Sequence, residues 1–257
     1  MVIQSITSRR NQRLRELRRL HQRKHRREQG LFVAEGEDLV AAALRHGVAP
    51  RTVFSVHGAG LPFSLPDGVE HVEASAEALS AVSSLGSGSR VIGVFELPDA
   101  PELAPAGSSA VYLHDVADPG NVGTVLRAAH AFGAHAVILS ERTADPFGPK
   151  AVRASMGALF AVRVARAPLQ EARRELGLDA VALVPGSGTP LRALDLAQPR
   201  MFVLGAERTG LPADVTDACG EVAHVPLAPG GPDSLNVAMT ATLCLYESAA
   251  HRLRSDG

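Results

Sequence analysis

Three short segments of the chain combine glycine or proline turns with polar side chains that could hold a ligand or move a proton. They are HDVADPGNVGTVLRAAHAFGAHAVIL (residues 114–139), FVLGAERTGLP (202–212) and HVPLAPGGPDSLNVAMTATLCLYE (224–247). In each, an apolar run typical of a buried strand leads into the turn. Open α/β sheets bind ligands at the carboxyl ends of their strands, which is where Asn121 of the first segment must lie.

In the first segment Asn121 falls at the start of a predicted helix, and Arg127 lies off its apolar stripe. Arg127 is therefore available to a ligand. Each residue also has a plainer explanation, since Asn121 could be only a helix cap and Arg127 only a surface arginine. The segment is not GxGxxG, so it gives no support for dinucleotide binding.

In the second segment Gly205 ends a strand and would let a ligand approach the backbone closely. Glu207 could accept a hydrogen bond from a ribose hydroxyl, or it could be a solvated turn residue. The third segment predicts a long buried helix beginning at Asp233-Ser234, with Ser234 and Asn236 in its first turn. Free N–H groups and polar side chains at a helix start can hold a polar or anionic ligand.

Strand and helix patterns alternate strongly from Ala110 onward, which predicts a mostly parallel sheet with helices on both faces. Strands are expected at 110–116, 135–140, 160–165, 180–184, 200–205 and 221–227, and helices near 121–132, 149–157, 169–176, 212–218 and 234–252. Residues 31–97 predict a smaller α/β unit with a helix from Asp38 to Arg45. We therefore expect domains at 1–97 and 110–257, joined by a Pro- and Ala-rich linker at 98–109.

The formal net charge of −1 conceals a basic N-terminal arm on an acidic body. The first 30 residues carry a net charge of +8, and the remaining residues a net charge of −9. This asymmetry favours a polyanionic partner. Ser5 to Gln29 also has a helical pattern that would bury Leu14, Leu17 and Leu20, and the two interpretations are compatible. Candidate phosphate contacts are Arg9, Arg10, Arg13, Lys150 and Arg153, the last two near a third strand end, where solvated charge is the plainer alternative.

Several classes of protein are disfavoured by the sequence. The two cysteines, Cys219 and Cys244, form no CxxC pair, and the ten histidines show no HExxH spacing, so we expect no metal site. The separated cysteines favour a reducing compartment, the cytoplasm. No apolar run approaches the ~18 residues of a membrane span, so no membrane association is expected. The absence of Trp favours charge over stacking in any contact with nucleic acid.

Taken together and in this order, DPGNVGTVLRAA, LGAERTGL and VPLAPGGPDSLNVAMTATLCLYE resemble the three motifs of the SpoU (TrmH) family of RNA ribose 2′-O-methyltransferases. DPFGPKAVRASMGALF is similar to the family's intervening segment. The resemblance covers roughly residues 110–250. The N-terminal region, with LFVAEGEDLV, resembles more weakly a ribosomal-protein L30e-like substrate-binding domain. Ala206 and Asp233 depart from residues common in the family, and neither departure removes a functional side chain.

The resemblance implies an α/β domain with a C-terminal trefoil knot, which binds S-adenosylmethionine in a bent form. It also implies a homodimer with the active site at the subunit interface. The family's functional polar residues correspond to Asn121, Arg127, Glu207, Ser234 and Asn236. Cofactor contacts are expected from Val184, Leu204, Gly205, Glu207, Val225, Pro226, Leu227, Leu235 and Asn236.

The expected activity is S-adenosylmethionine-dependent 2′-O-methylation of a ribose in RNA, with 23S ribosomal RNA favoured as substrate. A transfer-RNA methyltransferase, an antibiotic-resistance methyltransferase and a non-catalytic RNA-binding protein remain alternatives. A dehydrogenase is disfavoured by the missing glycine fingerprint. Arg127 is proposed in the family to act on the 2′-hydroxyl. Because arginine stays protonated in proteins, we favour phosphate positioning and charge stabilisation over a role as base.

Overall fold

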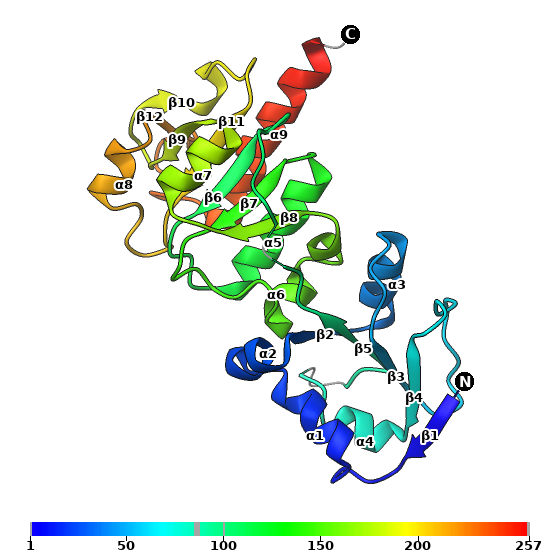
Figure 1. Ribbon diagram of the computed structural model, residues 1–257. Helices are drawn as coiled ribbons and strands as arrows, with labels where there is room; N and C mark the ends of the chain where they lie inside the picture. The colour runs from blue at the N-terminus through cyan, green and yellow to red at the C-terminus, as the bar shows by residue number, and fades with distance from the viewer. Residues whose placement is uncertain (1, 85–87, 100, 256–257) are drawn as a thin grey trace. The chain divides into compact units, whose positions relative to one another are not determined.

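The computed structural model describes residues 2–84, 88–99 and 101–255 (Figure 1). Its contacts divide the chain into unit 1, Met1–Asp99 with Asp145–Phe160, and unit 2, Ala100–Ala144 with Ala161–Gly257. Residues 145–160 lie within the domain predicted at 110–257, yet they pack with unit 1. The linker predicted at 98–109 stays a prediction.

Unit 2 is built on a seven-stranded sheet of order β10-β12-β9-β11-β6-β7-β8, in which every pairing is parallel. The strands are β6 (Ala110–Leu113), β7 (Ala136–Leu139), β8 (Arg163–Arg166), β9 (Asp179–Leu183), β10 (Thr189–Pro190), β11 (Arg200–Leu204) and β12 (Glu221–His224). The predicted α/β class with a mostly parallel sheet is confirmed. Strand β10 was not predicted, because two residues are too few to produce an apolar pattern. The trefoil knot stays a prediction.

Helices cover both faces of this sheet (Figure 1). They are α5 (Pro119–Ala131), α7 (Leu169–Leu176), α8 (Ala213–Asp217) and α9 (Val237–Ser255), with a 3-10 turn, η2, at Leu191–Ala193. Helix α7 packs on alternate strand residues such as Tyr112, Ile138 and Met201. Since side chains alternate along a strand, the intervening buried residues face the other way, toward α5 and α9.

Helix α5 follows β6 and presents the first motif. The Asp118 side chain caps it by accepting a hydrogen bond from the Gly120 N–H at 2.7 Å, and Pro119 occupies the first turn. Val122, Val125 and Leu126 are fully buried, whereas Arg127 is exposed. The apolar stripe therefore fixes the rotation of the helix and leaves Arg127 on its solvent face.

Helix α9 begins later than predicted. The sequence predicts a start at Asp233-Ser234, but the first helical residue is Val237. Asn236 is the capping residue, since its Oδ1 accepts hydrogen bonds from the N–H groups of Ala238 at 2.9 Å and Met239 at 3.4 Å. Asparagine is a strong cap, and this one directly precedes the buried run of the helix. Ser234 consequently lies in the preceding loop.

Unit 1 contains a mixed five-stranded sheet of order β1-β4-β3-β5-β2. Its strands are β1 (Val2–Ile6), β2 (Leu31–Glu35), β3 (Thr52–Val56), β4 (Glu70–Ala74) and β5 (Val91–Glu96), and its helices are α1 (Gln12–Arg19), α2 (Arg23–Gln29), α3 (Glu37–Arg45), α4 (Ala76–Ser80) and α6 (Pro149–Ala154), followed by the 3-10 turn η1 (Ala158–Phe160). The helix predicted from Asp38 to Arg45 is confirmed as α3.

The continuous helical pattern expected from Ser5 to Gln29 is wrong. The segment begins with β1, which pairs with β4 and gains ladder hydrogen bonds there, and it continues as two helices separated at residues 20–22. Asn11 caps α1 by accepting a hydrogen bond from the Arg13 N–H at 2.9 Å. The predicted inward packing of Leu14, Leu17 and Leu20 is confirmed.

Residues 145–160 are held in unit 1 by an aromatic cluster and a close backbone contact. The rings of Phe147 and Phe160 pack on those of Phe32 and Phe95, with centroid distances of 5.1 and 4.9 Å. Gly157 approaches α3 so closely that a Cβ there would lie 2.4 Å from the Cβ of Ala42. Lys150 and Arg153 on α6 therefore belong to unit 1.

A buried ion pair fixes the start of this segment. Arg26 is only 3% exposed. Its guanidinium donates to the carbonyl oxygens of Leu20 and His21 at 2.8 and 2.9 Å and to Asp145 Oδ2 at 2.6 Å. Its Nε has no hydrogen-bond partner among the described residues. Because a buried charge is tolerated only when paired, unit 1 depends on Asp145.

We expect Asp145→Ala to lower the free energy of unfolding by about 3–5 kcal/mol, because it leaves a buried guanidinium without its counter-ion. The double variant Arg26→Met/Asp145→Ala should recover much of that loss, since it removes both charges. Urea denaturation measures these differences, with the exposed Arg27→Met as control. Equal stability of Asp145→Ala and the unmodified chain would show that the pair contributes nothing.

Candidate functional site

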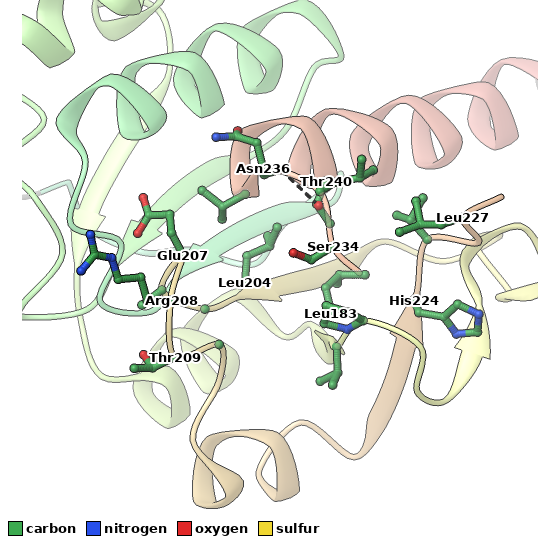
Figure 2. Close-up of a pocket in the computed structure, with 18 residues that line it drawn as sticks. Leu183, Leu204, Glu207, Arg208, Thr209, His224, Leu227, Ser234, Asn236 and Thr240 are labelled. Atoms are coloured by element: carbon green, nitrogen blue, oxygen red, sulfur yellow. Dashed lines mark hydrogen bonds between the residues drawn. The ribbon is translucent and has the colours of Figure 1, made fainter. Parts of the chain in front are cut away.

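A pocket of ≈ 460 Å³ lies in unit 2 at the carboxyl ends of β9, β11 and β12 (Figure 2). Its apolar wall includes Leu183, Leu204 and Leu227. Polar side chains enter from the second and third motifs. Figure 2 shows Glu207, Arg208 and Thr209 at one end of the pocket, and His224 and Leu227 at the other. The turns of the second and third motifs therefore lie together at this edge of the sheet.

Most residues predicted to contact a cofactor line this one pocket. They are Val184, Leu204, Gly205, Glu207, Val225, Leu227, Leu235 and Asn236. Pro226 does not line it, although both of its neighbours in the sequence do. Ser234 lines it from the loop before α9. Their contact with a cofactor stays a prediction.

The three motifs are joined by a chain of side-chain hydrogen bonds. Asn236 Nδ2 donates to Asn121 Oδ1 at 3.0 Å, and Asn121 Nδ2 donates to Glu207 Oε1 at 2.8 Å. One residue comes from each motif. Asn121 does not line the pocket itself, but it links two residues that do.

The direction of these bonds is set from both ends. At one end, Asn236 Oδ1 already accepts helix N–H groups, so only its Nδ2 can donate onward. At the other end, Glu207 presents an acceptor, so Asn121 must turn its Nδ2 toward it. An asparagine amide is ambiguous by itself, but here the helix start and the carboxylate leave one consistent arrangement.

Glu207 is held ionised by the groups around it. Burial alone would raise the pKa of its carboxyl, but hydrogen bonds from Asn121 and from the backbone N–H groups of Glu207, Ala117 and Asp118 outweigh burial and lower the pKa below its ordinary value of 4.5. The N–H of Ala117 lies 3.4 Å from Oε2. Because both oxygens already accept protein donors, the geometry favours Glu207 as an organiser of the loops around the pocket.

The loop that carries Glu207 is closed on itself. Ala206 and Gly210 form a β-bridge, with the Gly210 N–H 2.9 Å from the Ala206 oxygen. A Cβ on Gly205 would lie 2.3 Å from the backbone of Gly210. The sequence suggested that glycine is needed at position 205 so that a ligand can approach the backbone. In the structure, the backbone of the same loop is what lies close to Gly205.

Arg127 stands apart from the pocket. It is exposed on α5 and makes no hydrogen bond or ion pair with the described part of the chain. It lies six residues after Asn121, or roughly 9 Å along the helix axis at the α-helical rise of about 1.5 Å per residue. Its guanidinium is therefore free to meet a ligand at the surface of α5.

The predicted RNA-contacting residues have different surroundings in unit 1. Arg9, Arg10, Lys150 and Arg153 are exposed. Arg13 instead forms an ion pair with Glu70, whose pKa it lowers through that hydrogen bond. Arg13 is thus engaged within the fold, which its position in a basic segment did not reveal.

Sequence reasoning missed several lining residues: Leu183, Pro185, Ala206, Arg208, Thr209, Gly210, His224, Val237 and Thr240. Most of these missed residues are sequence neighbours of a predicted residue. Their positions at the ends of predicted strands could therefore have identified them. Thr240 lies one turn after Asn236, with its Oγ1 3.2 Å from the Asn236 carbonyl oxygen, as marked in Figure 2.

Two further features bear on possible ligands. Within the described ranges, no three His, Cys, Asp or Glu side chains come together in a way that could hold a metal ion. None of the helices in the described ranges is long and apolar enough to cross a membrane.

We expect Asn121→Asp to loosen the 205–212 loop. The new carboxylate would face Glu207 instead of donating to it, and like charges at this distance raise the pKa of one carboxyl. In the unmodified chain the depressed pKa of Glu207 contributes stability above pH 4.5 that is lost as the pH falls through the lowered pKa.

Hydrogen–deuterium exchange of the loop measures the effect. In Asn121→Asp, protection should fall at about pH 7.5 and partly recover at about pH 5, where one carboxyl regains a proton. Asn11→Asp is the matched control, because it makes the same change at the cap of α1 in unit 1, where the carboxylate still caps the helix and the Asn236–Asn121–Glu207 chain is untouched. Equal protection in both variants at both pH values would contradict the polarity of the chain.

The geometry agrees with comparisons to known proteins. The family model described as "SpoU rRNA Methylase family" matches residues 108–246, and the "MRM3-like substrate binding domain" model matches residues 11–93. A Bacillus subtilis protein named 23S rRNA (guanosine(2553)-2′-O)-methyltransferase RlmP is 29% identical over 95% of this chain and 98% of its own length.

Two solved structures are similar over nearly the whole chain. An AdoMet-bound rRNA methyltransferase from Sinorhizobium meliloti is 32% identical with a TM-score of 0.85, covering 97% of this chain and 98% of its own. The SpoU methyltransferase AviRb from Streptomyces viridochromogenes, in complex with AdoMet, is 27% identical with a TM-score of 0.82, covering 95% and 99%. The motifs, the parallel sheet and these matches agree: the chain belongs to the SpoU rRNA methylase family.

Proposed function

We propose that this chain transfers the methyl group of S-adenosylmethionine to a ribose 2′-hydroxyl in ribosomal RNA. The observation that carries the proposal is the pocket lined by the second and third motifs, whose residues Glu207 and Asn236 are joined through Asn121 of the first motif. The relatives named as rRNA methyltransferases, two of them solved with the cofactor bound, support the reaction class.

The residues present fit this cofactor. Leu183, Leu204 and Leu227 offer an apolar wall for an adenine ring, and the loop backbones at the strand ends offer donors and acceptors. Glu207 keeps a negative charge at the pocket because its pKa is lowered, which suits a cationic ligand. When bound, the sulfonium of the cofactor supplies the electrophilic methyl group.

The chain's own residues would align the ribose and manage its proton. The 2′-oxygen forms a bond to the methyl carbon as the carbon–sulfur bond breaks, and the hydroxyl proton leaves to a phosphate oxygen or to water. Because arginine side chains keep their positive charge in proteins, Arg127 would position the adjoining phosphate and stabilise developing negative charge. Ser234 and Asn121 would orient the ribose and Arg127.

Ribosomal RNA is favoured over transfer RNA as the substrate. Residues 11–93 match a substrate-binding domain model, and exposed arginines such as Arg9 and Arg10 can contact phosphates from unit 1. We also propose that the protein acts in the cytoplasm, which is supported by two buried, unpaired cysteines, Cys219 and Cys244.

A homodimer is the proposed assembly, and α9 offers the surface for it. Met239, Leu243 and Tyr246 recur at helical spacing and are 58%, 37% and 53% exposed. Three large apolar side chains on one stripe of a well-packed helix favour burial against a second copy. The stripe begins beside Asn236, so a partner seated on it would adjoin the pocket.

Arg127→Ala should reduce methyl transfer by at least about 100-fold, because it removes the group that positions the adjoining phosphate and stabilises developing negative charge. Binding of S-adenosylmethionine should stay within about twofold, since Arg127 does not line the pocket. The measurement is mapping of 2′-O-methyl positions in ribosomal and transfer RNA. The RNA comes from cells in which the chromosomal gene is deleted and either the unmodified chain or the variant is expressed from a plasmid.

We expect one ribose of 23S ribosomal RNA to lose its methyl group without the gene and to regain it with the unmodified chain only. Arg163→Ala, an exposed arginine on β8, is the matched control and should restore methylation. Restoration by Arg127→Ala would remove Arg127 from the mechanism. A methyl group lost from transfer RNA would change the substrate, and no lost methyl group in either RNA would overturn the function.

Leu243→Asp should convert the dimer into monomers, because it places a charge in the centre of the α9 stripe. Light scattering after size-exclusion chromatography measures the mass. Met156→Asp is the matched control, since Met156 is an apolar residue of unit 1 with 56% exposure. A monomeric unmodified chain, or a Leu243→Asp variant that stays dimeric, would reject this interface.

A further inference from the structure

Arg208 is a pocket residue that the hydrogen-bond chain does not use. It lies at the tip of the Ala206–Gly210 turn, is exposed, and lines the pocket beside Glu207 (Figure 2). No other arginine or lysine is among the described residues that line the pocket. The pocket thus combines one permanent cation with an ionised carboxylate.

The guanidinium of Arg208 has no partner in the described part of the chain. Two other arginines of unit 2 are engaged, since Arg142 pairs with Asp115 and Arg200 lies 3.5 Å from Asp179. The neighbouring Glu207 does not neutralise Arg208, because its oxygens already accept from Asn121 and backbone N–H groups. The positive charge therefore remains available at the rim of the pocket.

The backbone beneath Arg208 is held in place although its side chain is free. The Ala206–Gly210 bridge closes the turn, and Gly210 adopts a φ of 67°, which favours glycine. Glu207 ties the same turn to α5 through Asn121. The base of the Arg208 side chain is therefore fixed relative to the network that would orient the ribose.

We infer that Arg208 binds a phosphodiester group of the RNA next to the target ribose and so positions that ribose over the pocket. The inference rests on the proposed function. A free guanidinium matches a phosphate through two parallel hydrogen bonds. The carboxylate of the cofactor is the competing partner. The exposed position of Arg208 at the rim of the pocket favours the RNA polyanion, and the measurement of cofactor affinity distinguishes the two.

The test compares Arg208→Ala, Arg208→Lys and the control Arg192→Ala, an exposed arginine of unit 2 outside the pocket. The substrate is an unmodified 23S ribosomal RNA transcript, with methyl transfer followed from radiolabelled S-adenosylmethionine. RNA affinity is measured separately by filter retention across a series of salt concentrations. Cofactor affinity is measured by calorimetry without RNA.

For Arg208→Ala we expect the RNA KM to rise about tenfold, and the salt slope of RNA binding to shrink by about 0.7–0.9, the loss of one phosphate contact. Cofactor affinity should stay within about twofold, because Arg208 is not assigned to the cofactor. Arg208→Lys should restore part of the KM, because it keeps the charge but not the paired donors. Arg192→Ala should match the unmodified chain.

An unchanged salt slope and KM in Arg208→Ala would overturn the inference. So would a loss of cofactor affinity with unchanged RNA binding, which would assign Arg208 to the cofactor's carboxylate. If the unmodified chain binds the transcript but never methylates it, the proposed function fails, while the salt slope still decides whether Arg208 contacts phosphate.

Discussion

The hydrogen-bond chain from Asn236 through Asn121 to Glu207 is the interaction on which the site depends. It begins at the free N–H groups of α9 and ends at a carboxylate, so each amide has one usable orientation. The start of α9, the rotation of α5 and the shape of the 205–212 loop are thereby coupled. Without it, the three segments would still lie at the sheet edge, but the polar side chains of the site would lose the contacts that hold them relative to one another, and in-line methyl transfer needs that alignment.

The parallel sheet brings these segments together. The charged side chains of the two units differ in their surroundings. Unit 2 supplies a pocket with an ionised Glu207 and an unpaired Arg208, and Arg127 lies unpaired outside the pocket on α5. Unit 1 supplies exposed cations such as Arg9 and Arg10, and its core includes Leu14 and Leu17 of α1. Residues 145–160 lie between β7 and β8 in the sequence, but they belong to unit 1, where they pack on Phe32 and Phe95. Asp145 completes the ion pair with Arg26 there. The fold of unit 1 thus requires a segment encoded between two strands of unit 2.

Much of unit 2 could be predicted because its strands are short apolar runs and its helices carry clear buried stripes. The polar site residues could be predicted from their places at strand ends and from the resemblance. Three features escaped. The start of α9 was misplaced because Ser234 and Asn236 are both good caps, and only the structure shows which one meets the N–H groups. The charge of Arg13 and Arg26 could be counted, but a sequence does not say which cations are paired internally. The mutual contact of Asn121 and Glu207 depends on tertiary geometry alone.

The central claim is that this chain of three residues shapes a pocket for S-adenosylmethionine, and calorimetric titration of that cofactor tests it most directly. We expect the unmodified protein to bind the cofactor at one saturable site per chain. Asn121→Ala should bind at least about tenfold more weakly, a loss of about 1.4 kcal/mol. Equal affinity in both proteins would contradict the structural role of the chain, and no binding by the unmodified protein would contradict the pocket itself.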